Sequence, residues 1–438
     1  MLVFRKNIFR LILCCCGLQF LMAIPAYSQG ITYNQHIAPI IQTHCVSCHN
    51  PNGLAPFSLM TFADVSSRAK FIGFVTKTKY MPPFKADNSF QHYKNENILS
   101  PEEIQTIQEW INSGTNEGKR ISKKQQLTIL DTHVNKIQNT GISPKQVDIS
   151  VGMSKKFSIT EVGKEEFRFF HIPLTNKDPH YIKSIQFIPG NKKLVHHSRI
   201  MIDTTGEIAG IDGLSETDTN IYKYQTKPLA DPFLFGWVPG NDQISFPEGT
   251  GKMLYPKSDF ILNMHYSPSP IETSDSSSIR IQFTDKPVER EVVTLTLTES
   301  NISNQPFIIK ANSTPTFYMR SPLIPEDISL ISIMPHMHLL GKSFKAFAVT
   351  PAGDIIPLIH IPDWDFNWQM TYTFQHYIHV PKGSVIYAEA QYDNTTNNER
   401  NPNRIPKDVG YGWGSRDEMM NLVIYYVKYK IGDEHKAL

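Results

Sequence analysis

Cysteine is scarce in this 438-residue chain, and most of it lies near one end. Of the five cysteines, Cys14, Cys15 and Cys16 fall in an N-terminal apolar run, and only Cys45 and Cys48 lie beyond it. Two cysteines so close in sequence cannot join distant parts of a fold. We therefore expect the folded chain to depend on hydrophobic cores and not on disulfides.

An excess of charge of one sign is also missing. The chain has 43 basic and 41 acidic residues, a formal net charge of +2. Loss of the first 28 residues would remove three positive charges and no negative one, which leaves −1. This balance gives no reason to expect nucleic acid or an anionic membrane surface as a partner. No later apolar run approaches the ~20 residues of a membrane span, so we expect a mature chain with no stable membrane span.

The N-terminal run itself predicts export. Basic residues precede an apolar stretch, residues 11–24, and Ala26-Tyr27-Ser28 offers small residues for cleavage before Gln29. We therefore expect residues 1–28 to be a Sec-type signal peptide and the mature protein to be periplasmic.

The two remaining cysteines belong to a recognisable motif. Cys45-Val-Ser-Cys48-His49 is the C-x-x-C-H pattern of covalent c-type haem attachment, in which the histidine binds the iron from one side. Met81, in a proline-held loop, is the candidate for the second axial ligand. Met60 competes with it, although its surroundings are typical of core packing. A redox dithiol with an incidental histidine is the simpler alternative, and the exported context favours haem.

A well-marked helix closes this N-terminal part. Ser100 can cap it, Pro101 suits its first turn, and Glu103 completes a capping box. Residues 32–118 resemble a small class I cytochrome c, so we predict an all-α cytochrome c domain at residues 29–118 with one covalently bound haem c. The polar residues 119–146 are expected to form a linker.

Beyond residue 147 the pattern changes to strand-length alternation of apolar and polar residues. Clear runs are residues 167–173, 182–189, 194–202, 259–266 and 279–283. Two all-β antiparallel sandwich domains, at residues 147–290 and 291–438, are the simplest account.

Histidine and methionine pairs stand out in this β half. If His336 and His338 lie on a strand, both imidazoles point to the same face and can bind one metal ion. The chain also offers His196-His197, His265 and the pair Met419-Met420. Imidazole and thioether together favour copper over zinc or calcium. Adjacent residues of a regular strand face opposite sides, so His196-His197 can share a metal only at a strand end or a bulge.

Five stretches carry a family resemblance. They are Gly190-Asn-Lys-Lys-Leu-Val-His-His-Ser, Gly236-Trp-Val-Pro-Gly, Phe260-Ile-Leu-Asn-Met-His-Tyr, Pro335-His-Met-His-Leu-Leu-Gly-Lys and Asp417-Glu-Met-Met-Asn-Leu. In this order they resemble the copper type II, ascorbate-dependent monooxygenases, the family of peptidylglycine α-hydroxylating monooxygenase and dopamine β-monooxygenase. The resemblance covers residues 147–430.

The resemblance implies one copper on each of two jelly-roll-like sandwich domains, facing each other across an open cleft. His196, His197 and His265 would hold the copper that transfers electrons. His336, His338 and a methionine would form the catalytic site with the second copper, where oxygen is activated. The segment Trp364-Asp-Phe-Asn-Trp368 could line the cleft or serve only as packing.

Which methionine binds can be argued from a strand over residues 419–427. Met420, Leu422 and Ile424 would share a wholly apolar face, as core residues do, whereas Met419 lies on the face of Asn421. We therefore expect Met419 to be the ligand, and the family motif Asp-Glu-Met agrees.

The chain also departs from the family. In the peptide-amidating members an arginine two residues before His-x-His and a tyrosine four residues after the methionine hold the substrate carboxylate, but here Met334 and Val423 stand there. Peptide amidation is therefore not expected, and a small apolar or aromatic substrate is favoured.

Together these observations predict a periplasmic copper-dependent monooxygenase that hydroxylates a C–H bond with O2. Two copper ions would bind the histidine sets, and the haem would bring electrons from a periplasmic or respiratory donor. A non-catalytic haem and copper electron-transfer or copper-binding protein is the alternative. Zinc hydrolase chemistry is disfavoured by the methionine and by the lack of an obvious general-base carboxylate beside His-x-His.

Overall fold

The structure is a computed structural model. It describes residues 30–119, apart from 52 and 54, and residues 146–438, apart from 161, 226–228 and 242. The predicted signal peptide and residues 120–145 of the predicted linker lie outside the described residues. Within the described ranges, no helix is both long and apolar enough to cross a membrane.

The first described segment is helical. Its elements are a π-helical turn Tyr33–Ile37, α1 Ala38–His44, α2 Phe62–Ser66, α3 Ala69–Lys77 and α4 Pro101–Asn112. All of them contribute to one core around Trp110, which is fully buried. The capping box of α4 is confirmed, because Ser100 Oγ accepts from the backbone N–H of Glu103, whose side chain accepts from the N–H of Ser100. That this helical segment is a cytochrome c stays a prediction.

The chain from residue 149 to 291 forms the first group of β-sheets. Its elements are β1 Ile149–Gly152, β2 Phe157–Ile159, β3 Glu166–Pro173, β4 His180–Ile188, β5 Val195–Asp203, β6 Leu214–Ser215, β7 Asp231–Trp237, β8 Gln243–Ser245, β9 Thr250–Leu254, β10 Asp259–Tyr266, β11 Thr273–Asp275, β12 Ser278–Phe283 and β13 Arg290–Glu291, with a 3-10 turn Ala209–Ile211 and the helix α6 Thr219–Gln225. One sheet has the order β1-β12-β4-β9-β13 with β8 beside β4, and a second has the order β6-β3-β10-β5-β7. A short sheet pairs β11 with β2.

These two larger sheets pack face to face around a hydrophobic core. Phe260, Leu262 and Met264 of β10 are fully buried in that core, together with residues of β4, β5 and β12. Because side chains alternate along a strand, Asn263 and His265 of β10 point to the opposite face of the sheet. On that outer face Asn263 lines a pocket together with residues of the second half, whereas Ile261 packs against Ile208, Ile211 and Ile221 of the first half.

The second half is a further group of sheets. Its elements are β14 Val293–Leu297, β15 Ile308–Ile309, β16 Thr316–Arg320, β17 Ile328–His336, β18 Gly341–Val349, β19 Ile355–Ile361, β20 Tyr372–Val380, β21 Val385–Tyr392, β22 Val409–Gly410 and β23 Asn421–Lys428, with 3-10 turns Glu299–Asn301 and Asp433–His435. The sheet β14-β23-β17-β20 packs on the sheet β16-β21-β18-β19 around a second core, and β15 pairs with β22. The expected antiparallel sheets are thus present; every pair named here is antiparallel except β9 with β13.

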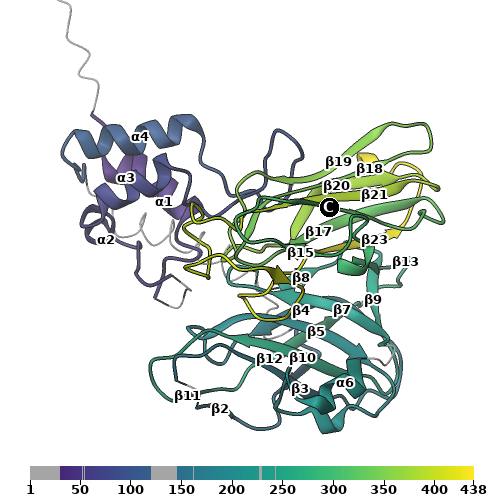
Figure 1. Ribbon diagram of the computed structural model, residues 1–438. Coiled ribbons are helices and arrows are strands. Elements are labelled where there is room, and N and C mark those ends of the chain that lie inside the picture. Colours follow the sequence, from purple (N-terminus) through teal and green to yellow (C-terminus); the bar gives the residue numbers. More distant parts are fainter. Residues whose placement is uncertain are drawn as a thin grey trace, which may run out of the picture.

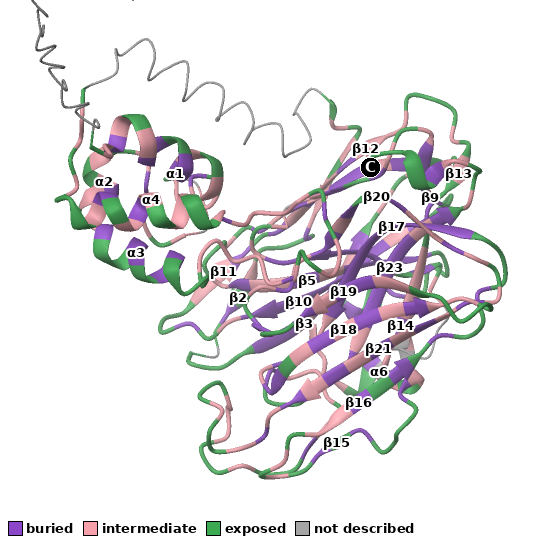
Figure 2. Ribbon diagram, turned by 90° about the horizontal axis from the view of Figure 1, so that it is seen from above, coloured by how far each residue is buried: buried purple, intermediate pink, exposed green. Residues whose placement is uncertain are grey.

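The two halves share buried surface. On β17 and β23, one set of residues enters the second core, and the other set, including Met334, Val423 and Tyr425, enters the core of the first half. The Tyr425 hydroxyl also donates to the carbonyl of Leu234 at 3.2 Å. Figure 2 shows buried residues along β5, β10, β17 and β23, where the halves meet.

The segment between α3 and α4 leaves the helices and joins the second half. The ring of Tyr93 lies among those of Phe84, Tyr372 and Phe374 at centroid distances of 5.2 to 6.1 Å, and its hydroxyl donates to the carbonyl of Leu358 at 2.8 Å. Tyr93 is only 1% exposed and belongs to the second core. Figure 1 shows the helices at one side of the sheets, with this segment extending from them toward the second half.

Candidate metal centre

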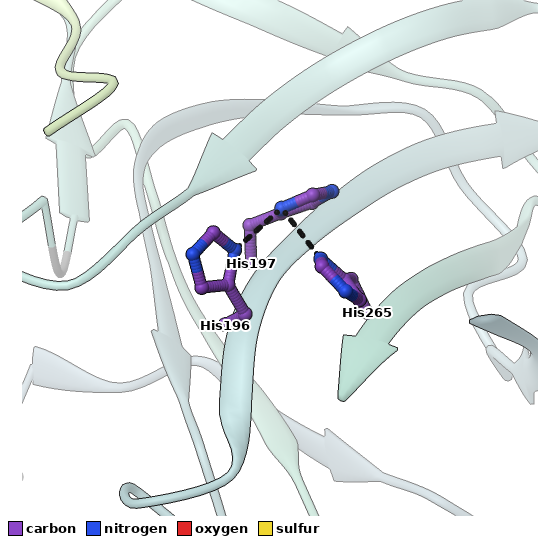
Figure 3. A group of neighbouring side chains, drawn as sticks. All are labelled: His196, His197 and His265. Carbon is purple, nitrogen blue, oxygen red and sulfur yellow. Dashed lines mark hydrogen bonds between the residues drawn. The ribbon is translucent and has the colours of Figure 1, made fainter. Parts of the chain in front are cut away.

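His196, His197 and His265 form a compact cluster on β5 and β10 (Figure 3). Across the two strands His265 faces His197, and the next pair is Tyr266 with Val195, so His196 is the extra residue of a bulge. The bulge turns two adjacent side chains toward one point, which a regular strand cannot do. The expectation that these neighbours can meet only at a strand end or bulge is confirmed.

The nitrogen positions of this cluster fit a metal ion. Nδ1 of His197 lies 3.2 Å from Nδ1 of His196 and 3.4 Å from Nδ1 of His265. Three ligands at about 2.0 Å from a metal with tetrahedral angles would be about 3.3 Å apart. Two of the nitrogen pairs therefore have the spacing of a metal site, and the ligand atoms of all three residues lie within 4.8 Å of one another.

The surroundings keep His196 and His197 neutral and orient His265. Burial lowers the pKa of His196 to about 3 and that of His197 well below its ordinary value. Glu165 Oε2 lies 3.6 Å from Nε2 of His265, so a proton on Nε2 leaves Nδ1 as the lone pair that faces the cluster. The Phe167 ring stacks on His265 at 4.1 Å and limits its rotation.

His336 and His338 lie at the end of β17. The strand ends at His336, so His338 follows it in a turn, and the expectation that both lie within one strand is wrong by two residues. Nδ1 of His336 contacts Oε1 of Gln369, and Nδ1 of His338 donates to the carbonyl of Asp417 at 3.0 Å. Each contact leaves Nε2 as the metal-binding atom.

Both rings are unprotonated at neutral pH, with His338 buried and His336 half-buried. Burial lowers the pKa of His336 to about 4, against the opposing effect of Gln369, and the pKa of His338 to about 3. Their centroids lie 5.0 Å apart. Neutral imidazoles with defined tautomers are what a divalent or monovalent copper ion requires.

Glu418 holds the turn that carries His338. Its carboxylate accepts backbone N–H groups from His338 at 2.9 Å, Leu340 at 2.6 Å and Met419 at 3.3 Å. Burial raises its pKa to about 8, although the three donors act in the opposite direction. Because its oxygens are occupied by these backbone groups, Glu418 is not available as a general base beside His-x-His.

The two methionines have different environments. Met419 lines a pocket together with His336 and His338, and Nδ2 of Asn421 lies 3.6 Å from its sulfur. Met420 is fully buried in the second hydrophobic core. Both precede β23, which begins at Asn421, so the strand starts later than expected. The geometry therefore favours Met419, and its role as a ligand stays a prediction.

The two histidine sets lie against each other. The rings of His197 and His336 are 6.1 Å apart, and both line a pocket that opens to solvent, with about 780 Å³ of empty space when that solvent is included. Phe366 stacks on His196 at 4.8 Å and meets His338 edge to face at 5.8 Å. The resemblance implied an open cleft between two separate sites, whereas here the two sets lie in contact and Phe366 touches both.

Several side chains at this site were given no role from the sequence. Gln369, Glu165 and Arg199 lie in none of the five stretches, and Glu418 lies in the last of them but was not singled out; their contacts become visible only in the structure. For Arg199 a signal existed, because it follows His197 by two residues on a predicted strand and so shares its face. For Phe366 the choice between lining the cleft and packing was left open; its ring is buried and packs on His196 and His338, and it is not among the residues that line the pocket.

The haem motif lies in the helical segment. Cys45 follows α1, and the two motif cysteines are not joined in a disulfide. Nδ1 of His49 donates to the carbonyl of Phe57 at 3.0 Å, which leaves Nε2 for an iron atom. Met60 packs on the helical core as expected, and Met81 is half-buried in the loop after α3. These residues fit a covalent haem, whose presence and whose second ligand stay predictions.

Comparison with known families concerns the second half. Residues 293–435 match the family model described as copper type II ascorbate-dependent monooxygenase, C-terminal domain. This part of the chain is similar to a copper monooxygenase domain. The matched residues include His336, His338 and Met419, so the match supports copper and monooxygenase chemistry at the second set. It covers less than half of the chain and does not extend to the helical segment.

Other comparisons add little. No curated protein matches the chain in sequence. Among solved structures, the major capsid protein P2 of bacteriophage PM2 aligns with a TM-score of 0.25 and 9% identity over 65% of this chain and 99% of that one. Allantoicase aligns with a TM-score of 0.18 and 12% identity over 55% and 83%. Such low TM-scores carry no argument about function.

Proposed function

We propose that the protein is a periplasmic copper-dependent monooxygenase that converts a C–H bond to C–OH, with its haem segment as the attached electron donor. The reaction combines substrate, O2, two electrons and two protons to give hydroxylated product and water. The observation that carries the proposal is the meeting of both histidine sets and Met419 around one pocket. The family match of the second half supports the same chemistry.

The protein's own side chains supply binding and orientation. His196, His197 and His265 would hold one copper through Nδ1. His336 and His338 would hold a second through Nε2, together with the Met419 sulfur, a ligand that stabilises the cuprous state. Bound copper would supply O2 activation and single-electron transfer.

The pocket walls have their own part in the chemistry. Phe167 and Phe366 cover the rings of the first set, and the buried neighbours of Met419 exclude bulk water. Exclusion of water prevents electrons from being lost to side reactions before substrate is in place.

The attached donor is supported by how the helical segment docks. Nδ2 of Asn95 donates to the carbonyl of Thr371 at 3.0 Å, and Gln369, two residues before Thr371, contacts His336. A chain of direct contacts therefore leads from the helical segment to the second histidine set. Covalent tethering also raises the effective concentration of a donor at its acceptor.

The first test is the copper-to-haem ratio of the purified, reconstituted mature chain, from elemental analysis and the haem absorbance of the same sample. We expect two copper ions per haem. One copper, none, or zinc in their place would contradict the proposal. For the donor role, Cys45 and Cys48 are both changed to Ala; unaltered turnover with a physiological donor would refute it.

A non-catalytic copper-binding or electron-transfer protein is the second candidate, because the first histidine set alone would suffice for it. Substitution of Met419 separates the two. A monooxygenase should lose hydroxylation and keep the copper of the first set, whereas a binding protein has no turnover to lose. A zinc hydrolase is less well supported, since Glu418 is committed to three backbone N–H groups.

A further inference from the structure

A cation lies one step along the sheet from the first histidine set. Arg199 follows His197 by two residues on β5, and across the ladder it faces Asn263 just as His197 faces His265. Residues two apart on a strand share a face and are separated by about 6.6 Å. Arg199 and Asn263 therefore stand beside the histidines on the same side of the sheet, and both line the same pocket.

The guanidinium of Arg199 makes no hydrogen bond or ion pair with any described residue, and its Nε is buried without an acceptor. The side chain as a whole is half-buried. The Trp413 ring lies 5.1 Å from Cζ, and Tyr411 and Glu299 are near enough for their charges to act on it. A guanidinium is charged at neutral pH, and one that lines a pocket without an ion pair can bind an anion there.

Two further polar groups of the pocket are available to bind a ligand. Nδ2 of Asn263 and Oγ1 of Thr296 are buried and have no hydrogen-bond partner within the described part of the chain. With Arg199 they offer several donors to one region, which is the arrangement that an oxygen-rich anion requires.

Apolar and polar side chains share the rest of the pocket. Phe233, Met334 and Val423 line it, together with the polar residues Ser198, Thr298, Gln369 and Asn421. Gly236 faces Arg199 across the ladder, and a Cβ there would lie 3.1 Å from the Met334 sulfur and 2.7 Å from the Phe233 ring, so the glycine keeps these side chains close. The pocket thus combines candidate metal ligands, an apolar wall and a cation.

We propose that Arg199 binds the carboxylate of the substrate, so that the molecule hydroxylated here is an organic acid with an apolar or aromatic body. The inference rests on the proposed function for its chemical step and names the substrate class. The planar guanidinium can hold a carboxylate through two parallel hydrogen bonds, with the apolar body directed along Met334 and Val423. We expected an apolar or aromatic substrate because Met334 and Val423 replace the carboxylate-binding arginine and tyrosine of the peptide-amidating members. Arg199 supplies a positive charge from a different strand.

The test uses the full mature chain, copper-loaded and metal-depleted, titrated with phenylacetate, 3-phenylpropionate and 4-phenylbutyrate. Each acid is compared with its neutral amide by calorimetry. We expect at least one acid to bind 10-fold or more tightly than its amide, in both forms of the protein. Arg199→Gln should lose that preference, and Arg199→Lys should retain part of it, which shows the role even if the glutamine variant folds poorly.

Arg416→Gln is the matched control. Arg416 is exposed on the loop that carries Trp413 and lies outside the pocket. Its substitution by Gln therefore removes the same charge without changing a contact to the ligand. Equal binding of acid and amide, no binding of any acid, or the same loss in both variants would overturn the proposal.

A substitution of Glu299 tests the alternative that Arg199 has only a structural role. It is the carboxylate whose charge acts on Arg199, although the two form no ion pair. If Arg199 served only as its counter-ion, Glu299→Gln would leave acid binding unchanged; as a ligand anchor, Arg199 should bind acids more tightly in that variant. If the protein binds acids but takes up no copper, the monooxygenase proposal fails and the carboxylate site at Arg199 stands. If it takes up two copper ions but binds no acid, the carboxylate site fails and the monooxygenase proposal stands.

Discussion

Acidification of the metal-free protein from pH 7 to pH 5 should destabilise it through the candidate ligands. Burial lowers the pKa of His196 to about 3, of His338 to about 3 and of His336 to about 4, and it lowers that of His197 well below its ordinary value. In the unfolded chain each has a pKa of about 6.5. The unfolded chain therefore takes up protons that the folded chain refuses, so this stability is complete above pH 6.5 and is lost as pH falls toward the folded values.

The size of the loss follows from the same pKa differences. Between pH 6 and pH 5 each histidine should cost about 1 kcal/mol, and the four together about 4 kcal/mol. Domains of this kind are stable by about 5–15 kcal/mol, so the loss is easily measured.

The assay is urea denaturation of metal-depleted protein at pH 7, 6 and 5, followed by tryptophan fluorescence. His338→Gln removes one of the four groups and should reduce the pH-dependent loss by about one quarter. His435→Gln, at an exposed position, is the matched control and should leave it unchanged. A wild-type change below about 1 kcal/mol between pH 6 and pH 5, or equal slopes for the two variants, would refute the reasoning.

Three further changes test the site and its support. Met419→Leu should remove one of two coppers by elemental analysis, whereas Met420→Leu should keep both and cost less than about 1.5 kcal/mol; equal copper contents would contradict the choice of ligand. Glu418→Gln should destabilise the metal-free chain by about 1.5–3 kcal/mol and lower copper at the second set, because its amide nitrogen would meet backbone donors; an unchanged denaturation midpoint and full copper would count against it. Tyr93→Ala should cost about 3–5 kcal/mol in urea denaturation, and a loss below 1 kcal/mol would show that the segment contributes little to the second core.

Much of the β architecture could be predicted from the alternation of apolar and polar residues along the chain. The strands expected at 194–202 and 259–266 are found as β5 and β10, and their antiparallel pairing brings His197 opposite His265. The requirement for a bulge at the adjacent histidines came from strand geometry alone, and the structure supplies it. Local pattern determines which residues share a face, so these inferences needed no knowledge of the tertiary structure.

Other features depend on contacts that alternation cannot reveal. Gln369 contacts His336 across 33 residues, and Glu418 reaches His338 across 80. The contact of the two histidine sets depends on how β17 and β23 pack on the first half. In the sequence Arg199 looks like any polar residue of a half-exposed strand. Only the structure shows that its guanidinium has no hydrogen-bond or ion-pair partner among the described residues.

The position of Tyr93 means that the helical part of the chain cannot be removed without damage to the second core. This tyrosine belongs by sequence to the haem-motif part of the chain, yet its ring fills the second core beside Phe374 and Tyr372. A shortened chain that starts at residue 147 would expose those rings to water and leave a hole where Tyr93 lies. The helical part is therefore not a detachable accessory, and its exchange for another domain would have to keep residues 84–97 as part of the second half.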